Sequence, residues 1–366
     1  MGDTGRLILH TEASIGFGGQ EIRIVAEARW LLDHGWQVLI AGQPGSPLLE
    51  ESARLGVPAV AVRMRRALDL PALLTLRRLI VGRGVALVHT HSSIDSWLGG
   101  LAARSCRRPV VRSRHVTITI PRRRGAVYRL ADRVISSGAA AARVVEAAGV
   151  PAARIVPIPP GVDTARFHAA VSGAGVRAEL GLDGAPVAGL VANIRGSKGH
   201  DVFLEAARLV LAREPAARFL IVGDGIGFDD VRRRVGALGL EAAVRMTGFR
   251  RDIPEVMAAL DVLVLPSLRS EAASQVIAQA LAVGTPVVAT AVGGSGELVR
   301  DGDTGWLVPP GDAGALAAAI LDCLADREGA RAMARRGQRL VQERHSLDAA
   351  MARTTLVYRE LLGGPR

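Results

Sequence analysis

The sequence predicts an α/β protein with two Rossmann-like domains that face each other across a cleft, followed by a helical C-terminal tail. Short apolar runs alternate with longer amphipathic ones along most of the chain, which is typical of βα units and a parallel sheet. The alternation comes in two series, separated by a stretch at 158–175 that is rich in Pro and Gly. A chain of 366 residues is also too long for one ordinary core and suits two domains.

The first series predicts seven strands and the second predicts six. The strands of the first series are expected at 6–10, 37–41, 57–62, 86–90, 109–113, 133–137 and 154–158, and those of the second at 187–193, 218–223, 243–248, 261–266, 286–290 and 305–309. A helix over 20–34 should end at Gly35, because glycine readily adopts the left-handed conformation that closes helices. After residue 310 the pattern is helical. We therefore expect an N-terminal domain at 1–165 and a C-terminal domain at 166–345.

The composition is that of a soluble globular protein, with 49% hydrophobic and 22% charged residues. Only 3% are aromatic, which argues against a stacking platform for single-stranded nucleic acid. Cys106 and Cys323 lack metal-ligand spacing, and we expect both to be buried thiols in a reducing compartment. The N-terminus lacks the pattern of a signal peptide. The uncharged stretch at 272–296 is interrupted by Gly and Pro, so we do not expect it to span a membrane. These features predict a cytoplasmic protein.

Positive charge is concentrated in the first half of the chain. Residues 1–165 hold 22 arginines against 12 acids, a net charge of +10, and the remainder holds 24 basic residues against 23 acids. Such an excess attracts nucleic acid, an anionic membrane surface or an acidic acceptor. Alternatively, arginine is simply the solvated cation that this protein uses, since 45 of its 46 basic residues are Arg. The densest cluster is Arg104, Arg107, Arg108, Arg112, Arg114, Arg122, Arg123, Arg124 and Arg129.

The segment at 191–200, VANIRGSKGH, contains the only asparagine, Asn193, and the only lysine, Lys198, of the protein. It is expected to run from a strand end through a Gly-containing loop to a helix start. In a chain dominated by Arg, one Lys indicates a need for a compact ammonium. With Arg195 and the helix N-terminus it would form an anion site suited to phosphates. The alternative is that all three are solvated loop residues.

The first βα loop carries Gly16, Gly18 and Gly19 ahead of a helix, which lets backbone amides approach an anionic ligand. It does not match G-x-G-x-x-G, and no acid closes the next strand, which argues against NAD. A tight turn without a ligand is the alternative. His89 and His91 lie two residues apart at a strand end and so share a face, and His115 is a third candidate ligand. Zinc is geometrically feasible there, but no Cys or carboxylate cluster completes the set. We expect no metal, and His89 or His91 to line the cleft.

Several segments, in this order along the chain, resemble the retaining glycosyltransferase family 4, which has the two-Rossmann GT-B fold. They cover almost the whole chain: GGQEIRIVAEARWLLDHGWQV (18–38), VHTHSS (88–93), SRH (113–115), IPPGVDTARF (158–167), NIRGSKG (193–199), VGDG (222–225), TGFRRDIPEVMAALDVLVLPS (247–267) and SEAASQVIAQALAVGTPVVATAVGG (270–294). The resemblance also implies that a final helix, at about 346–366, packs back on the first domain.

The resemblance implies a role for each matching residue. Arg195 and Lys198 would hold the donor's pyrophosphate and neutralise the charge that develops as it leaves, without a metal. Backbone amides of Ala273 and Ser274 would support the same phosphates, and Glu271 would bind hydroxyls of the transferred sugar.

Other matching residues would surround the sugar and the base. His115 would lie near the sugar, and Gly18 and Gly19 would line the face of the first domain where donor and acceptor meet. Phe249 and Arg250 would contact the base. Asn193 would also face the donor. On the acceptor side we expect His89, His91, Arg112 and Arg114.

One position departs from the family's pattern. The family has two glutamates with seven residues between them; here the first is Glu271 and the second position holds Gln279, while Ala272 replaces the usual glycine. Gln279 can still hydrogen-bond ribose hydroxyls, but without the strength of a charged acceptor. The presence of Gln279 in place of the family's glutamate could change which nucleotide the donor carries.

The resemblance implies a metal-independent, retaining glycosyltransferase that needs no cofactor. Its donor would be a nucleotide-sugar, with UDP favoured over GDP or ADP. Its acceptor would be a glycan or lipid-linked glycan in cell-envelope polysaccharide or lipopolysaccharide synthesis. The basic first half would contact the inner face of the cytoplasmic membrane, and we expect no nucleic acid partner. The alternatives are a nucleotide-sugar epimerase of the same fold and a non-catalytic nucleotide-sugar-binding protein.

Overall fold

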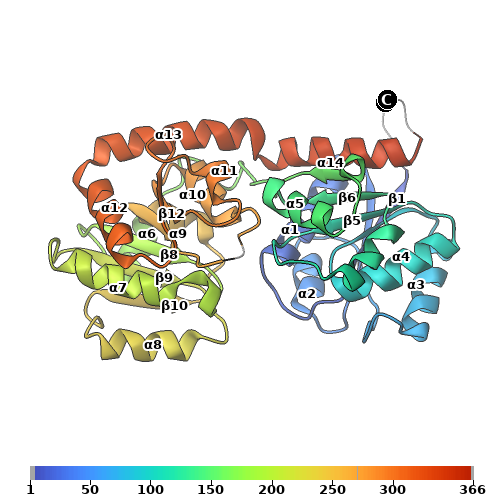
Figure 1. Cartoon of the computed structure of the whole chain (residues 1–366), viewed down its shortest axis with the longest axis horizontal. Coiled ribbons are helices and arrows are strands. Elements are labelled where there is room, and N and C mark those ends of the chain that lie inside the picture. Colours follow the sequence, from blue (N-terminus) through green and yellow to red (C-terminus); the bar gives the residue numbers. More distant parts are fainter. Residues whose placement is uncertain (1–4, 270, 364–366) are drawn as a thin grey trace. The chain divides into compact units, whose positions relative to one another are not determined.

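The computed structural model describes residues 5–269 and 271–363, apart from the side chains of 122–124, so part of the densest arginine cluster lies outside the description. The chain divides into two compact units, each with its own parallel sheet (Figure 1). Unit 1 comprises the described residues up to Gly161 and from Leu347 onward, and unit 2 comprises Val162–Ser346. The chain thus leaves unit 1 once and returns to it for its last helix.

Unit 1 contains a seven-stranded sheet of order β3-β2-β1-β4-β5-β6-β7, parallel throughout. The strands are β1 (Leu7–Glu12), β2 (Gln37–Gly42), β3 (Ala59–Ala61), β4 (Val85–Thr90), β5 (Val110–Arg114), β6 (Arg133–Ser136) and β7 (Ile155–Pro157). The helices are α1 (Gly19–Asp33), α2 (Pro47–Arg54), α3 (Leu70–Gly82), α4 (Ser93–Ser105), α5 (Ala139–Ala147) and α14 (Leu347–Leu361), with 3₁₀ turns at Arg122–Leu130 and Ala152–Arg154.

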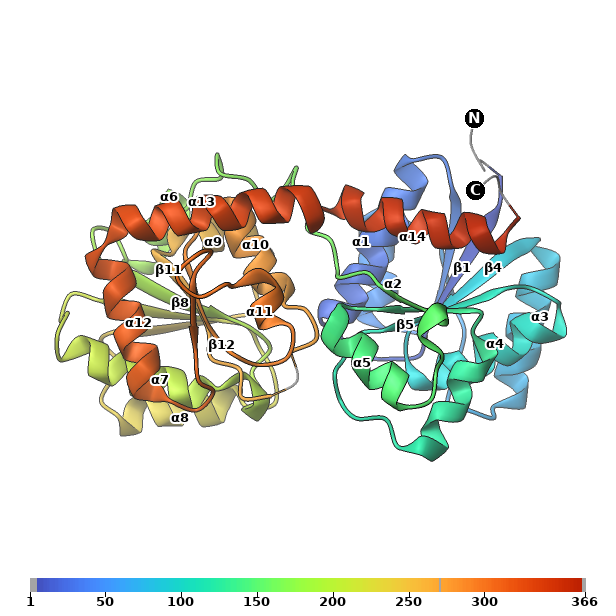
Figure 2. The same ribbon diagram turned by 45° about the horizontal axis from the view of Figure 1, so that its top comes forward.

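Two apolar layers sandwich this sheet, because successive residues of a strand point to opposite faces. In β1, Ile8 packs with α1, α2 and α14, whereas Leu9 packs with α3, α4 and α5. Figure 2 shows α14 beside α1, and Met351 and Tyr358 of α14 are fully buried in this layer. The last helix is therefore part of the core of unit 1.

Unit 2 contains a six-stranded parallel sheet of order β10-β9-β8-β11-β12-β13. The strands are β8 (Val187–Val191), β9 (Arg218–Val222), β10 (Val244–Gly248), β11 (Val262–Leu265), β12 (Val287–Thr290) and β13 (Trp306–Val308). The helices are α6 (Ala174–Leu180), α7 (His200–Leu211), α8 (Phe228–Ala237), α9 (Ile253–Ala259), α10 (Gln275–Val283), α11 (Ser295–Leu298), α12 (Ala313–Ala325) and α13 (Arg327–Arg344), with a 3₁₀ turn at Gly196–Lys198.

The sheet of unit 2 also separates two apolar layers. Phe219 and Ile221 of β9 pack with α7, α8 and α12, while Leu220 and Val222 of the same strand pack with α9, α10 and the rest of the opposite layer. Both faces of these strands are apolar, as expected of a parallel sheet covered by helices on each side.

The fold prediction is confirmed at the level of elements. Each predicted strand overlaps an observed one, and α1 ends just before Gly35, which has a φ of 80°. The prediction for the thiols was wrong in one case: Cys323 is buried, but Cys106 is only half-buried, because it follows the end of α4 where the chain leaves the core. Among the described helices, none is both long and apolar enough to cross a membrane.

Strand order locates the candidate sites. In unit 1 the order reverses between β1 and β4, and in unit 2 it reverses between β8 and β11. In open α/β sheets, ligands bind outside the carboxyl ends of the strands at such a switch point. The loops that follow β1, β4, β8 and β11 are therefore the places to examine, and they contain half of the predicted site residues.

Candidate functional site

In unit 2, the loop after β8 lies against the loop after β11. Gly199 ends the turn that carries Lys198 and has a φ of 72°. A Cβ on Gly199 would lie 1.9 Å from the carbonyl oxygen of Pro266, so only glycine allows this approach. The amide of Leu268 also donates to the carbonyl of Ser197 at 2.9 Å. These contacts fix the position of Lys198 relative to the β11 loop.

Lys198 forms an ion pair with Glu271 at this switch point. The Nζ of Lys198 donates to Oε1 of Glu271, and the hydroxyl of Ser267 donates to the same oxygen at 2.5 Å. Thr290 of β12 in turn donates to the carbonyl of Ser267 at 2.6 Å. The side chain of Glu271 is 6% exposed and that of Lys198 is 17% exposed. A cation and an anion are thus held together in a largely dehydrated place, where electrostatic interactions are strong.

Two glycines after β12 fix the backbone of Glu271. Gly293 has a φ of 57°, and a Cβ there would lie 1.8 Å from the carbonyl oxygen of Glu271. The amide of Gly294 donates to that same carbonyl at 2.9 Å. A Cβ on Gly294 would also lie 2.2 Å from the carbonyl oxygen of Ala272. The two glycines are visible in the sequence, but their contact with the backbone of Glu271 and Ala272 is not.

The next residues form the N-terminus of α10. Ser274 caps this helix, since its hydroxyl accepts a hydrogen bond from the amide of Ile277 at 3.4 Å. Ala273 precedes the cap and is half-buried, and Gln279 is half-buried further along the helix. The first amides of a helix lack partners within it and carry partial positive charge, so this end favours an anion.

The remaining donor-side residues of the β8 loop differ in exposure. Asn193 and Arg195 are exposed. His200, at the start of α7, is buried, and neither of its ring nitrogens has a hydrogen-bond partner among the described residues. Burial lowers the pKa of His200 to about 4, so its imidazole is neutral at pH 7. Sequence reasoning missed His200, although it directly follows the Lys198-Gly199 pair.

After β10, Phe249 and Arg250 are arranged differently. The ring of Phe249 is 54% exposed. The guanidinium of Arg250 lies 2.6 and 2.8 Å from the carboxylate of Glu179, and 2.9 and 2.5 Å from that of Asp252. The hydrogen bonds to Glu179 and Asp252 raise the pKa of Arg250 above its ordinary value. Phe249 therefore offers an exposed ring, with the guanidinium carbon of Arg251 5.5 Å from its centroid, whereas the charge of Arg250 is already neutralised by two carboxylates.

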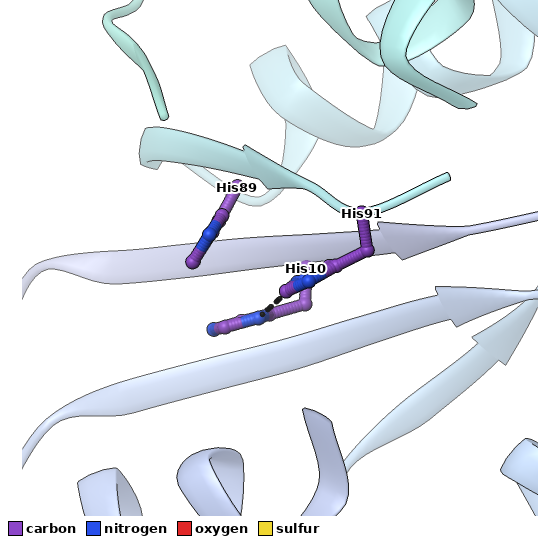
Figure 3. A group of neighbouring side chains, drawn as sticks. All are labelled: His10, His89 and His91. Atoms are coloured by element: carbon purple, nitrogen blue, oxygen red, sulfur yellow. Dashed lines mark hydrogen bonds between the residues drawn. The ribbon is translucent and has the colours of Figure 1, made fainter. Parts of the chain in front are cut away.

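In unit 1, three histidines meet where β1 and β4 lie side by side (Figure 3). His10 of β1 is in register with His89 of β4. Nδ1 of His10 lies 3.0 Å from Nε2 of His91, and Nδ1 of His91 lies 3.1 Å from Nε2 of His115. His10, His91 and His115 therefore form a continuous hydrogen-bonded chain, which we call the histidine chain. Sequence reasoning found two of its members and missed His10.

His89 has other partners. Its Nδ1 lies 2.6 Å from the hydroxyl of Tyr358 in α14, and its Nε2 lies 2.8 Å from the hydroxyl of Ser113. The ligand atoms of His10, His89 and His91 lie within 4.8 Å of one another. With both nitrogens of His89 engaged, the group fits a hydrogen-bond network better than a metal site.

Burial keeps these histidines neutral. It lowers the pKa of His10 to about 3, and it lowers the pKa values of His89, His91 and His115 well below the ordinary value. A neutral imidazole has one donor and one acceptor nitrogen. The histidine chain can therefore be satisfied only if all its tautomers run in one direction, so that each ring sets the tautomer of the next. His115, which is half-buried, is the outer end.

A buried carboxyl group organises the glycine loop after β1. Glu12 accepts a hydrogen bond from the amide of Ser14 at 2.7 Å and contacts the side-chain amide of Gln20. Gly18 caps α1, and its amide donates to Glu21 at 2.8 Å. Burial raises the pKa of Glu12 to about 8. Glu12 was also missed, although an acid that closes the first strand was a visible signal.

Asp95 supports the β4 end of the same site. Its carboxylate accepts hydrogen bonds from the hydroxyl of Thr11 at 3.0 Å and from the amide of His91 at 2.8 Å. Burial raises the pKa of Asp95 to about 6.

The two arginines predicted on the acceptor side lie in β5. Arg112 is 5% exposed and lies 3.8 Å above the ring of Tyr128. Burial lowers the pKa of Arg112, and its Nε and Nη1 have no hydrogen-bond partner in the described part of the chain. Arg114 is half-buried and donates to the carbonyl of Ile118. Arg112 is thus a buried cation beneath the surface, and Arg114 lies nearer to solvent.

Comparison with known proteins shows the family and agrees with the fold. A family model described as Glycosyltransferase Family 4 matches residues 17–166, and one described as Glycosyl transferases group 1 matches residues 185–326. The chain is 31% identical, over 391 aligned positions, to the D-inositol 3-phosphate glycosyltransferase of Geodermatophilus obscurus, an alignment that covers 94% of the chain and 86% of that protein.

Two further relatives match shorter stretches. The alpha-D-kanosaminyltransferase of Streptomyces kanamyceticus is 35% identical over 188 residues, covering 51% of the chain and 48% of that protein. The GDP-mannose-dependent alpha-(1-6)-phosphatidylinositol monomannoside mannosyltransferase of Mycolicibacterium smegmatis is 33% identical over 253 residues, covering 64% and 66%. The chain thus spans about half the length of the first of these.

A solved structure has the same fold. Anabaena Alr3699/HepE in complex with UDP-glucose superposes with a TM-score of 0.88, at 24% identity, over 97% of this chain and 99% of that one.

Proposed function

Because the chain belongs to glycosyltransferase family 4, we propose that it is a retaining, metal-independent glycosyltransferase that moves a sugar from a nucleotide-sugar to a hydroxyl group of a glycan or lipid-linked acceptor. The observation that carries this proposal is the Lys198–Glu271 pair at the β8/β11 switch point. It places a cation and a hydrogen-bond acceptor near the N-terminus of α10, which suits a ligand with both a diphosphate and hydroxyl groups.

In the proposed donor site the diphosphate lies between the β8 loop and the N-terminus of α10. The ammonium of Lys198 and the exposed guanidinium of Arg195 face it from one side, and the amides of Ala273 and Ser274 face it from the other. The amides belong to the folded backbone, so they would stabilise the charge of the leaving diphosphate without reorganising. This supply of positive charge replaces a metal ion in the proposal.

Glu271 takes two roles in turn. Without donor it holds Lys198 in place. With donor bound, Lys198 turns to the phosphates, and the carboxylate accepts hydrogen bonds from hydroxyls of the transferred sugar. The hydroxyl of Ser267 remains on Glu271 in both states and keeps its carboxylate oriented.

In the proposed reaction the acceptor oxygen attacks the anomeric carbon from the face that the diphosphate leaves. A bond forms between that oxygen and the anomeric carbon, and the bond between the anomeric carbon and the phosphate oxygen breaks. The proton of the acceptor hydroxyl passes to the departing phosphate. The donor configuration is therefore retained, and the protein supplies positioning and positive charge rather than a nucleophile.

Unit 1 would supply the acceptor side. In this proposal the loop held by Glu12 would present the backbone of Gly18 and Gly19, and His115, at the outer end of the histidine chain, would hydrogen-bond the sugar. His91 is a positioning residue in this scheme, because it fixes the ring orientation and tautomer of His115.

The substrates are proposed by chemistry and by analogy. We favour a UDP-sugar donor, with GDP and ADP donors as alternatives. The relatives named above act on inositol phosphate and on a phosphatidylinositol mannoside, according to their names. We propose a comparable envelope glycan or glycolipid acceptor, at the cytoplasmic face of the membrane.

A second candidate function is a nucleotide-sugar-binding protein without turnover. Gln279 and Ala272, where the family has glutamate and glycine, favour this alternative. It predicts nucleotide binding without sugar release under any acceptor.

Thermal unfolding with a panel of nucleotides tests the proposed donor site. Wild type and Lys198→Ala are unfolded with UDP, GDP, ADP, dTDP and CMP, in EDTA. A nucleotide at a hundred times its dissociation constant stabilises the folded state by about 2.7 kcal/mol. We expect one nucleotide to stabilise the wild type and to lose its effect in Lys198→Ala. If no nucleotide stabilises the wild type, with or without Mg²⁺, the donor site is wrong.

A further inference from the structure

Helix α3 of unit 1 exposes apolar side chains that a soluble protein usually buries. Leu70 is 61% exposed, Leu74 is 40% exposed and Val81 is 64% exposed. They are spaced by four and seven residues, so they lie on one side of the helix, while Leu76 and Ile80 on the opposite side are fully buried in the core.

The exposed apolar side chains continue into the preceding segment. Leu68 is 75% exposed just before the helix begins. Asp69 caps α3, since its carboxylate accepts a hydrogen bond from the amide of Ala72 at 3.3 Å. Leu68 and the first turn of α3 are therefore held in a defined position, and the apolar surface is part of the folded structure.

Arginines surround these apolar side chains. Residues 55–90 contain six arginines, and their only acid is Asp69. All six are exposed, and none of their guanidinium groups makes a hydrogen bond or ion pair with the described residues. Arg77 lies on the helix side that carries Leu74 and Val81, one turn from each. We call Leu68, Leu70, Leu74, Val81 and these six arginines the α3 surface: Arg63, Arg65, Arg66, Arg77, Arg78 and Arg83.

A hollow lies beside the α3 surface. It has a volume of about 340 Å³ and is lined by residues of β3 and α3, among them Val60 and Leu79, and by Val62, which follows β3. Arg78 and Arg83 of the α3 surface also line it. Strand β3 is the edge strand of the sheet. The hollow thus combines an apolar floor with two cationic side chains, which suits an amphiphile with an anionic head group.

These observations define the chemistry of the partner. Exposed leucines gain nothing from nucleic acid phosphates, and the protein lacks the aromatic side chains that stack on bases. A helix with exposed Leu and Val beside unpaired arginines is typical of elements that lie in the interface of an anionic bilayer. The densest arginine cluster of the sequence is less suited to this role, because Arg112 is buried and Arg104 is paired with Asp132 at 2.8 Å.

We propose that the α3 surface docks the protein on an anionic phospholipid membrane, with the leucines and Val81 inserted between head groups and the arginines on the lipid phosphates. The proposal deepens the proposed function, on which it rests for its biological sense, since a lipid-linked acceptor is presented at such a surface. The docking element itself is defined by unit 1 alone.

Sedimentation with vesicles tests the docking surface. The full chain is mixed with vesicles of phosphatidylcholine alone or of phosphatidylcholine with phosphatidylglycerol. Each arginine near an anionic surface strengthens binding by roughly fivefold. We expect binding only to the anionic vesicles, and Arg77→Gln/Arg78→Gln/Arg83→Gln should weaken it roughly a hundredfold. Leu70→Gln/Leu74→Gln should weaken it as well, and the residual binding should disappear in high salt.

Matched control variants carry the same changes elsewhere. Arg331→Gln/Arg335→Gln/Arg339→Gln removes three exposed arginines from α13, and Leu356→Gln removes a leucine that is 61% exposed on α14. These controls should bind anionic vesicles like the wild type. Circular dichroism and the thermal response to nucleotide show that each variant is folded.

Three outcomes would overturn the inference: no preference for anionic vesicles, equal losses in the α3 and control variants, or a wild-type dimer that Leu70→Gln/Leu74→Gln converts to monomer. Loss of vesicle binding with a normal nucleotide response would leave the proposed function standing. Normal vesicle binding without a nucleotide response would support the docking role of the α3 surface and contradict the proposed function.

Discussion

Replacing Lys198 by methionine should destabilise the protein even when no substrate is present. Methionine keeps the length and most of the volume of the lysine stem but removes the ammonium. The carboxylate of Glu271, whose side chain is 6% exposed, would then keep only the hydroxyl of Ser267 as a hydrogen-bond donor among the contacts the structure defines. An anion left largely dehydrated and without its cation is costly.

The magnitude follows from burial. Removing one partner of a fully buried ion pair costs about 3–5 kcal/mol. Because the side chain of Lys198 is 17% exposed, water reaches the site in part, and we expect a loss of about 2–3 kcal/mol. For a domain of about the size of unit 2, this corresponds to a decrease in Tm of roughly 5–10 °C.

A double-mutant cycle in urea gives the coupling between the two residues. Lys198→Met, Glu271→Gln and the double variant are unfolded, and the coupling energy is taken from the four free energies of unfolding. The double variant should recover most of the loss, because no charge remains buried. As a matched control, Arg234→Met breaks an exposed pair with Glu205 in the same unit and should cost less than about 1 kcal/mol.

The reasoning would be refuted if Lys198→Met were no more destabilising than Arg234→Met. It would also be refuted if the coupling energy between Lys198 and Glu271 were below about 0.5 kcal/mol, the level at which independent sites are additive.

Three further predictions concern single positions. Gln279→Glu should stay active in a transfer assay, since a carboxylate also binds ribose hydroxyls; an inactive variant would show that the amide has a specific role. Gly293→Ala should cost at least about 2 kcal/mol and abolish nucleotide binding, because its Cβ would strike the carbonyl of Glu271; Gly302→Ala, with a φ of 70° but open space, measures the backbone strain alone and should bind nucleotide normally. Lowering the pH from 6.5 to 4.5 should reduce the free energy of unfolding by about 2 kcal/mol through His10. The folded pKa of His10, about 3, lies below the unfolded value, so the unfolded chain takes up a proton that the folded chain does not. His10→Phe should remove this part of the pH dependence, and an unchanged dependence of the free energy of unfolding on pH would contradict the prediction.

The sequence predicted the strands well because both faces of the inner parallel strands, such as β8, β11 and β12, are buried. Their runs of Val, Ile and Leu are short, and loops that contain Gly or Pro lie at the ends of these runs. The predicted donor loops were also located correctly at the carboxyl ends of strands, since Lys198 and Asn193 were unusual in composition and the βα pattern fixed the edge.

The contacts between distant residues could not be predicted. His10 lies beside His91 only because β1 and β4 are neighbours, which is a property of strand order and not of local pattern. Likewise, the pairing of Arg250 with Glu179 joins residues 71 positions apart. Counting charges in the sequence predicts that the first half of the chain is basic. Only the structure distinguishes the buried Arg112 from the exposed arginines of the α3 surface.

The most direct test of the account is a transfer assay followed by NMR of the anomeric proton. It uses the nucleotide-sugar whose nucleotide stabilises the protein most, an envelope glycolipid fraction as acceptor, and EDTA throughout. The account predicts a product with the donor's anomeric configuration, formed without metal, at a rate that Lys198→Met lowers by about 10²–10³-fold. A product of inverted configuration, or turnover that needs a divalent metal, would contradict it.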